Sequence, residues 1–135
     1  MPLFTKLGKY NNTALLLLRI GIGIMMMMHG YPKLAGGMEK WEKLGGSMDV
    51  IGIHWAPTLW GFMAAISESI GGLFMLLGLF FRPTMFMLLF TMCIATVKHL
   101  TGGDTIMDAS HAIELGVLCL ALFIIGPGKY SIDKS

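Results

Sequence analysis

The stretch that decides the fold is TALLLLRIGIGIMMMMHGYPKL, residues 13–34. Only Arg19, His29 and Lys33 interrupt its apolar run with charged or titratable side chains. About 20 consecutive apolar residues are what a helix needs to cross the hydrocarbon core of a bilayer. Two asparagines before the stretch and a pair of glycines after it mark a helix start and a helix end. We therefore expect a membrane-spanning helix over residues 13–34.

Three further apolar stretches follow at residues 57–81, 84–100 and 109–125. The dipeptide Arg82-Pro83 is expected to form the break between the second stretch and the third. Residues 38–54 are too polar to span and predict a short amphipathic helix at the membrane surface. The sequence thus predicts an all-α fold with one domain over residues 1–135: a four-helix transmembrane bundle with a short interfacial helix in the first outer loop.

The composition agrees with a membrane protein and excludes other classes. Of the 135 residues, 55% are hydrophobic and 13% charged, with a mean hydropathy of +0.71, whereas soluble domains carry about 25% charged residues. The net charge of +2 is too small and too scattered for nucleic-acid binding. The lipid bilayer is the first expected partner.

The positive charges of the short connections give the orientation. Lys and Arg residues of short loops stay in the cytoplasm. One side of the predicted bundle holds five of them and the other side four. This count favours both termini in the cytoplasm, and we call the opposite side the outer side.

Several ionisable residues fall inside the predicted spans, where charged groups normally face a partner in the bundle interior. Arg19 and Glu68 lie deepest, so we expect them to form an ion pair at the floor of a polar pocket that opens outward. The residues of the outer half are His29, Lys33, Lys98, His99, His111 and Glu114. The alternative is a purely structural network of Arg19, Glu68 and Glu114, with the outer His and Lys side chains reaching the interface.

No metal site is expected. The run of four methionines at residues 25–28 contains soft ligands. Four consecutive residues, however, point all around a helix and cannot form one ligand set. We also find no flavin, haem or nucleotide motif.

Several short motifs, in order along the chain, resemble one known family. The first span carries Arg19 followed by HGYPKL at residues 29–34, and the second carries ESIGGL at residues 68–73. Residues 98–99 (KH), Glu114 and the closing GPGKYSID at residues 126–133 complete the set. Each motif alone is weak, but their order and spacing together resemble the DoxX-like integral membrane family.

This family is similar to the small membrane subunit of a thiosulfate:quinone oxidoreductase. The resemblance implies the bacterial cytoplasmic (inner) membrane, a quinone as ligand, a protein redox partner as electron source, and a role in quinone-linked redox or redox-stress chemistry. It leaves open whether the chain is itself part of an enzyme and whether it forms a homo-oligomer.

Under this interpretation the outer residues handle protons, because imidazole titrates near neutral pH. The expected catalytic residues are His29, His99, His111 and Glu114, and the expected ligand-binding residues are Arg19, Lys33, Glu68 and Lys98. Two alternatives remain open: a non-enzymatic scaffold or assembly partner that recruits another protein through residues 38–54, and a transporter of a small solute or metal. The absence of a detectable inverted repeat weakens the transporter hypothesis.

Overall fold

Helices account for most of the computed structural model, which describes residues 3–133. The α-helices are α1 (Asn11–Ala35), α2 (Gly37–Gly45), α3 (Pro57–Leu77), α4 (Phe81–Thr101) and α5 (Ser110–Ile125), and the 3-10 helices are η1 (Thr5–Tyr10) and η2 (Gly46–Ile51). No strand forms between residues 3 and 133. The all-α prediction is confirmed.

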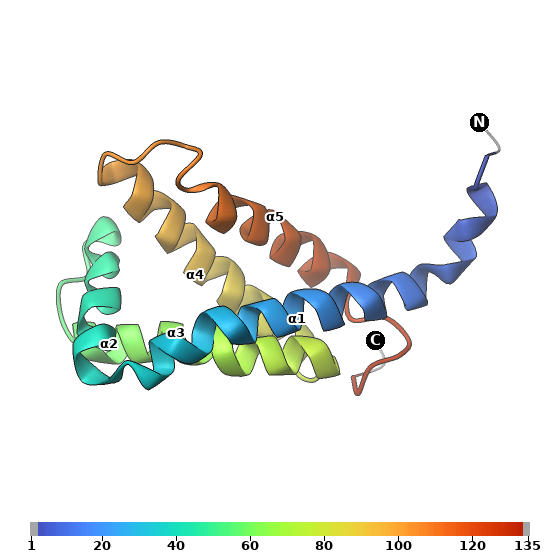
Figure 1. Cartoon of the computed structure of the whole chain (residues 1–135), viewed down its shortest axis with the longest axis horizontal. Helices are drawn as coiled ribbons and strands as arrows, with labels where there is room; N and C mark the ends of the chain where they lie inside the picture. Colours follow the sequence, from blue (N-terminus) through green and yellow to red (C-terminus); the bar gives the residue numbers. More distant parts are fainter. Residues whose placement is uncertain (1–2, 134–135) are drawn as a thin grey trace.

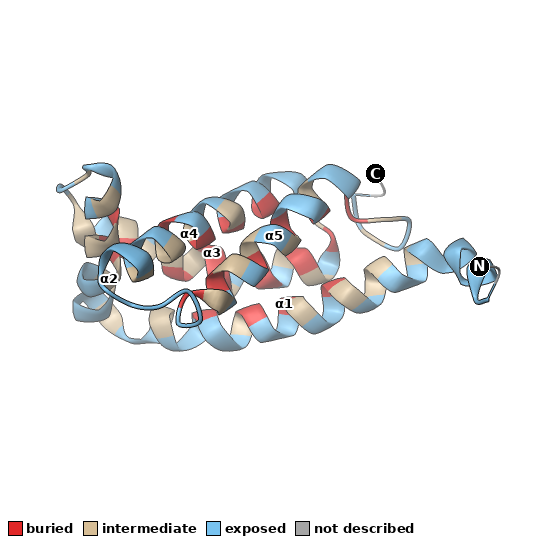
Figure 2. Ribbon diagram, turned by 90° about the horizontal axis from the view of Figure 1, so that it is seen from above, coloured by how far each residue is buried: buried red, intermediate tan, exposed pale blue. Residues whose placement is uncertain are grey.

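Helices α1, α3, α4 and α5 run along the molecule and alternate in direction, while α2 lies at one end beside the start of α3 (Figure 1). We call this the α2 end. The opposite end, where α3 turns into α4 and where both chain termini lie, is called the terminal end. At the terminal end the first turns of α1 and the preceding η1 project beyond the other helices (Figures 1 and 2).

Three helices are long and apolar enough to cross a membrane: the continuous helical segment Thr5–Ala35, then Pro57–Leu77 and Phe81–Thr101. The fourth apolar helix, α5, has 16 residues and is about 24 Å long, shorter than a hydrocarbon core of about 30 Å. The lengthwise helices bury the sides that face one another and expose apolar side chains outward (Figure 2). The chain is an integral membrane protein, and the crossing of α5 remains a prediction, as does the cytoplasmic location of the termini.

The helix boundaries agree with the predicted spans except at the turn between the second span and the third. The predicted break at Arg82-Pro83 is wrong: α3 ends at Leu77, and α4 already begins at Phe81. Pro83 fits the first turn of α4 because the backbone N–H groups there have no acceptor within the helix. The chain reverses instead at residues 78–80, where Gly78 has a positive φ of 68°.

The C-terminal loop, residues 126–133, ties the terminal end together. The carboxylate of Asp133 accepts hydrogen bonds from the backbone N–H groups of Phe80, at 3.1 Å, and Phe81, at 2.7 Å, at the start of α4. The backbone N–H of Asp133 in turn donates to the carbonyl of Gly78 at 3.0 Å. Gly126 and Gly128, with φ near +90°, give the loop its sharp bends. The closing GPGKYSID motif therefore has a structural role, because it binds the C-terminal loop to the turn between α3 and α4.

The segment between α1 and α3 holds two short helices where one interfacial helix is predicted. These are α2 and η2, and η2 contacts both α3 and α4. The indole N–H of Trp41 in α2 donates to the backbone carbonyl of Lys33 at 3.1 Å, and its ring packs against Phe62 of α3 at 4.8 Å. Trp41 thus fixes α2 to α1 and α3. Whether α2 lies at the membrane surface remains a prediction.

Candidate functional site

Close contact between α1 and α3 sets up the site. Gly30 lies against the backbone of α3, and a Cβ atom at this position would come within 2.7 Å of the carbonyl carbon of Glu68. A residue without a side chain lets two helices approach to this degree. Lys33 lies one turn further along α1, and the contact brings its side chain level with Glu68.

Lys33 and Glu68 form a short ion pair. The Lys33 ammonium donates to the Glu68 carboxylate at 2.7 Å, with 32% of the Lys33 side chain exposed and 7% of that of Glu68. The predicted pairing of Glu68 with Arg19 is therefore wrong, because Arg19 lies closer to the terminal end, beside the last turn of α3.

Arg19 is almost fully buried, with 1% of its surface exposed. Its guanidinium donates four hydrogen bonds to backbone carbonyls: to Met75 at 3.2 Å, Leu76 at 3.0 Å, Pro127 at 2.8 Å and Tyr130 at 2.9 Å. The first two carbonyls belong to the negative end of the α3 dipole, which favours a cation. Arg19 therefore joins α1, the end of α3 and the C-terminal loop, and it does not line the cavity described next.

A cavity of about 240 Å³ lies between α3 and α4, with η2 contributing Ser47 and Met48 to its lining. Its wall is mostly apolar, and its only charged lining residues are Lys33 and Glu68. The hydroxyl hydrogens of Ser67 and Thr91, which also line it, are used in hydrogen bonds to their own helices. Trp60 is another lining residue, but its indole N–H is buried, with no acceptor within residues 3–133 and almost no accessible surface. The hydrogen-bond donor that the cavity offers is therefore the Lys33 ammonium.

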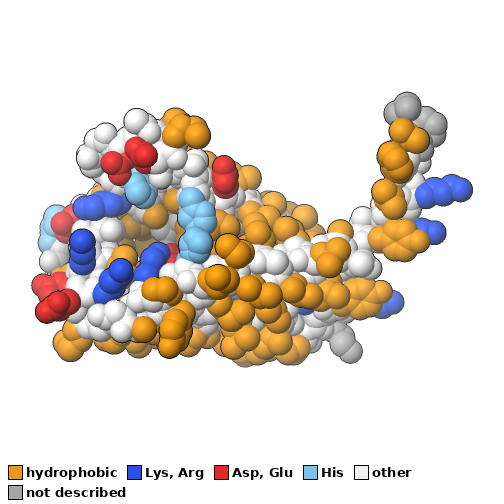
Figure 3. All heavy atoms as spheres, viewed as in Figure 1, with side chains coloured by type: hydrophobic (Ala, Val, Ile, Leu, Met, Phe, Trp, Pro, Cys, Tyr) orange, Lys and Arg blue, Asp and Glu red, His pale blue; other side chains and the backbone are white. Residues whose placement is uncertain are grey.

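The histidines predicted to be catalytic lie at the α2 end but outside this cavity. The rings of His29 and His111 stack with their centroids 4.8 Å apart, which brings α1 and α5 together. His29 Nδ1 lies 3.2 Å from the backbone carbonyl oxygen of Met25. Because a carbonyl oxygen only accepts, a hydrogen bond here requires the ring proton on Nδ1. Figure 3 shows His and Lys/Arg side chains gathered around a hollow at this end of the molecule. His29 precedes Lys33 by one helical turn, so the stacked pair is near the ion pair.

The remaining predicted site residues stand apart. His99, in the last turn of α4, forms an exposed pair with Asp104 of the connection to α5, 2.7 Å between Nδ1 and Oδ2. Lys98 and Glu114 are exposed and do not line the cavity. The structure therefore brings Lys33 to Glu68 and His29 to His111, and it leaves Arg19, Lys98, His99 and Glu114 outside both groups.

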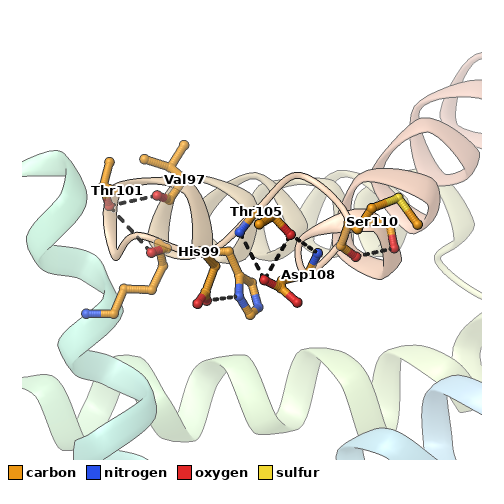
Figure 4. Close-up of polar contacts among 9 residues, drawn as sticks. Val97, His99, Thr101, Thr105, Asp108 and Ser110 are labelled. Atoms are coloured by element: carbon orange, nitrogen blue, oxygen red, sulfur yellow. Dashed lines mark hydrogen bonds and ion pairs between the residues drawn. The ribbon is translucent and has the colours of Figure 1, made fainter.

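The connection from α4 to α5 is held by a reciprocal cap (Figure 4). The Asp108 carboxylate accepts from the backbone N–H of Thr105 at 2.9 Å and from its hydroxyl at 3.0 Å. The backbone N–H of Asp108 donates to the Thr105 hydroxyl oxygen at 3.3 Å. The hydrogen bond from the Thr105 backbone N–H holds the pKa of Asp108 below its ordinary value. The hydrogen bond from the Thr105 hydroxyl and the nearby His99 act in the same direction. This cap positions the start of α5 and therefore His111.

The described residues contain no group of three His, Cys, Asp or Glu side chains that could hold a metal ion. Together, the apolar helices and the ion pair beside an intramembrane cavity define a helical membrane protein with a candidate small-molecule site.

Comparison with known proteins gives the family. The chain belongs to the DoxX family, whose model matches residues 14–100. It is similar to "Inner membrane protein YphA" of Escherichia coli (strain K12), with 27% identity over 138 residues that cover 94% of this chain and 93% of that protein. No solved structure matches. The family match includes Arg19, Lys33 and Glu68 and ends before His111 and Glu114.

Sequence reasoning missed Trp60 as a site residue. A tryptophan near the end of a span is usually an interfacial anchor, and nothing in the sequence separates Trp60 from Trp55 and Trp41. Only the packing of α3 against η2 and α4 shows which of the three indoles lines the cavity.

Proposed function

We propose that this protein is a quinone-linked component of membrane redox or redox-stress chemistry, and that the quinone ring occupies the cavity between α3 and α4. The observation that carries the proposal is the Lys33–Glu68 pair, 2.7 Å long, on the wall of an apolar cavity of about 240 Å³. Apolar walls with few polar groups are typical of sites for small organic ligands.

The fit rests on complementary chemistry. A quinone has flat apolar faces and carbonyl oxygens that accept hydrogen bonds, and its reduction to a quinol takes up two electrons and two protons. The phenylalanine and methionine side chains of the wall match the faces, and the Lys33 ammonium matches one oxygen. In this proposal the electrons come from a separate redox protein, as the family resemblance implies.

The ion pair holds a proton beside the cavity. Lys33 donates to the ligand oxygen, and Glu68 stabilises the ammonium and orients it. The stacked imidazoles of His29 and His111 lie at the α2 end, one turn of α1 from Lys33, and imidazole exchanges protons near neutral pH. In this proposal the two histidines return protons from water to the pair. His99 and Glu114 lie outside both groups and have no assigned step.

The experiment is equilibrium binding of 2-methyl-1,4-naphthoquinone to the full chain in lipid nanodiscs. Lys33→Met should weaken binding about tenfold or more, because a hydrogen bond from a charged donor contributes about 1.5–3 kcal/mol. Lys98→Met is the matched control, since this lysine lies at the same end but does not line the cavity. Equal affinity of the two variants would overturn the placement of the quinone at Lys33.

A second measurement separates redox chemistry from a scaffold role. Cells that depend on the protein under quinone stress are complemented with His29→Ala plus His111→Ala, with expression level scored beside growth. Loss of complementation at normal expression is expected. Full complementation would remove the histidines from the proposal and favour the scaffold. Trp41→Ala is unsuited to testing the scaffold, because Trp41 fixes α2 in place.

A further inference from the structure

The terminal end of the molecule is positively charged. Of the eight Asp and Glu residues only Asp133 lies there, and its carboxylate already accepts from the backbone N–H groups of Phe80 and Phe81. Figure 3 shows Lys and Arg side chains at this end with no Asp or Glu side chain beside them on the face in view. One carboxylate does not balance the exposed cations of this end, which among residues 3–133 are Lys6, Lys9, Arg82 and Lys129.

The N-terminal arm, residues 3–10, carries two of these cations. It contains η1 and projects beyond the other helices (Figure 1). Residues three apart share one side of a 3-10 helix, so Lys6 and Lys9 lie along one side of η1. By the same rule Leu7 and Tyr10 lie along another side, and they are 59% and 52% exposed. The arm is thus amphipathic, with a positively charged side and an uncovered apolar side.

The arm lies outside the hydrocarbon core of the bilayer. The continuous helical segment Thr5–Ala35 has 31 residues, whereas about 20 suffice for a span. Lysine in hydrocarbon is costly, so the start of this segment, with Lys6 and Lys9, lies at the level of the lipid head groups. A helical segment with a basic side and an apolar side typically lies in this interface, where its apolar side reaches the acyl chains. The charged side of the arm therefore meets lipid phosphates.

The C-terminal loop brings a third lysine to the arm. The backbone N–H of Lys129 donates to the side-chain oxygen of Asn12 at 2.9 Å, and Asn12 lies one helical turn after Lys9. A Cβ atom on Gly128 would come within 3.0 Å of Leu15, so the loop is packed closely against α1. The structure thus fixes the backbone of Lys129 beside the start of α1, although the two hydrogen-bonded residues are 117 apart in the sequence.

The three lysines have no anionic partner within the described residues. None of the ion pairs between residues 3 and 133 includes Lys6, Lys9 or Lys129. The Lys9 ammonium lies 5.1 Å from the centroid of the Tyr10 ring, a contact that leaves its charge unneutralised. Arg82, the fourth exposed cation, differs because its guanidinium donates to backbone carbonyls at the end of α5. The partner that the lysines fit is therefore an anion.

The bilayer supplies this anion in the phosphate of a lipid with a net negative charge. A second copy of the chain is a poorer partner, because it would bring a second positively charged arm and like charges repel. We propose that the N-terminal arm and Lys129 bind the phosphate of an anionic phospholipid, with Leu7 and Tyr10 against its acyl chains. This lipid site shares no residue with the cavity between α3 and α4.

The test compares the retention of two lipids by the full chain. The protein is released from nanodiscs of equal phosphatidylglycerol and phosphatidylcholine, and native mass spectrometry gives the ratio of the two lipids that stay bound. The unmodified chain should retain more phosphatidylglycerol, because phosphatidylcholine balances its phosphate with its own ammonium. Lys6→Gln plus Lys9→Gln should lower the ratio about fivefold or more, since each lysine near an anionic surface contributes about that factor.

Lys40→Gln plus Lys43→Gln is the matched control. It removes the same charge at the same spacing, but from α2 at the other end of the molecule, and should change the ratio less than twofold. Lys6→Arg plus Lys9→Arg keeps the charge and should keep the ratio. Equal losses in the two glutamine variants would show that only net charge matters and would overturn the proposal.

The contribution of the loop is tested separately. Lys129→Gln should lower the lipid ratio more than Arg82→Gln does, because the Arg82 guanidinium is held by α5. Equal effects of the two changes would remove the loop from the site.

The same spectra distinguish the other occupants. Inorganic phosphate, added at constant ionic strength, should leave the lipid ratio unchanged, and loss of phosphatidylglycerol would show a site for free phosphate instead. A dimer that Lys6→Gln plus Lys9→Gln separates would assign the arm to a second copy of the chain. Either result would overturn the proposal.

Discussion

Replacing Arg19 with methionine should cost this protein a large part of its stability. Methionine keeps an apolar stem in the core but donates no hydrogen bonds. Two of the four bonds from Arg19 are buried, to Met75 and Pro127, and two are partly buried, to Leu76 and Tyr130. Counting about 1.5 kcal/mol for each buried bond to a charged donor and half of that for each partly buried one gives about 4.5 kcal/mol. Domains are stable by only about 5–15 kcal/mol in total.

Arg82→Met is the matched control for this prediction. Arg82 also donates to backbone carbonyls at a helix end, to Phe123 at 3.0 Å and Ile124 at 3.3 Å, but it is exposed. Its replacement should cost less than about 1 kcal/mol. Both variants are unfolded by titration with a denaturing detergent and followed by helical circular dichroism.

Hydrogen exchange reports the same contact locally. The backbone amides of Ile132 and Asp133, in the C-terminal loop, donate to the carbonyls of Leu77 and Gly78 at the end of α3. Arg19→Met should raise the exchange rates of these two amides far more than Arg82→Met does. If the two variants lose equal stability and leave these amides equally protected, Arg19 does not hold the loop and our reasoning is refuted.

Three further outcomes follow from the site. Gly30→Ala should push α1 away from α3, because a methyl group there meets the backbone of Glu68; a variant as stable as the parent, by the same detergent titration, would contradict this contact. Lys33→Met and Glu68→Gln should each destabilise by about 2 kcal/mol, and together by less than their sum, because either single change strands a charge in a partly buried site; additive losses would show that the residues are not coupled. The cap on Asp108 should remain intact at neutral pH and be lost on acidification below the ordinary aspartate range, because a carboxyl whose pKa is lowered by folding stabilises only in its ionised form; the amide resonance of Thr105, followed by NMR against pH with Asp108→Asn as control, should move at this lower pH.

The sequence predicted the long-range plan of the fold because hydropathy directly reflects the bilayer. The helices expected at residues 13–34 and 109–125 form as α1 and α5, within two residues at each end. The turn between α3 and α4 was misplaced because the proline signal at Pro83 is stronger in sequence than the left-handed backbone at Gly78. Proline in a first helical turn breaks nothing, and only the structure shows in which turn it lies.

The candidate site was predicted in part. Reasoning from helix direction correctly put His29 and His111 at one end of the molecule, and their rings stack there. The predicted pairing of Glu68 with Arg19 is wrong because Arg19 donates to backbone carbonyls instead. Every residue has a backbone carbonyl, so no sequence pattern reveals such a partner. The cavity depends on how η2 sits between α3 and α4, which apolar periodicity does not determine.

The Arg19 contacts have a consequence for biosynthesis. The guanidinium belongs to the first helix, but two of its four acceptors, on Pro127 and Tyr130, lie 108 and 111 residues further along the chain. Until residues 127–130 have been made, the inserted chain therefore carries an arginine whose hydrogen bonds are incomplete, in a solvent where that state is costly. A truncated chain never satisfies it. The buried arginine thus makes stable packing of the first helix conditional on the loop at residues 126–133, which lies far from it in the sequence.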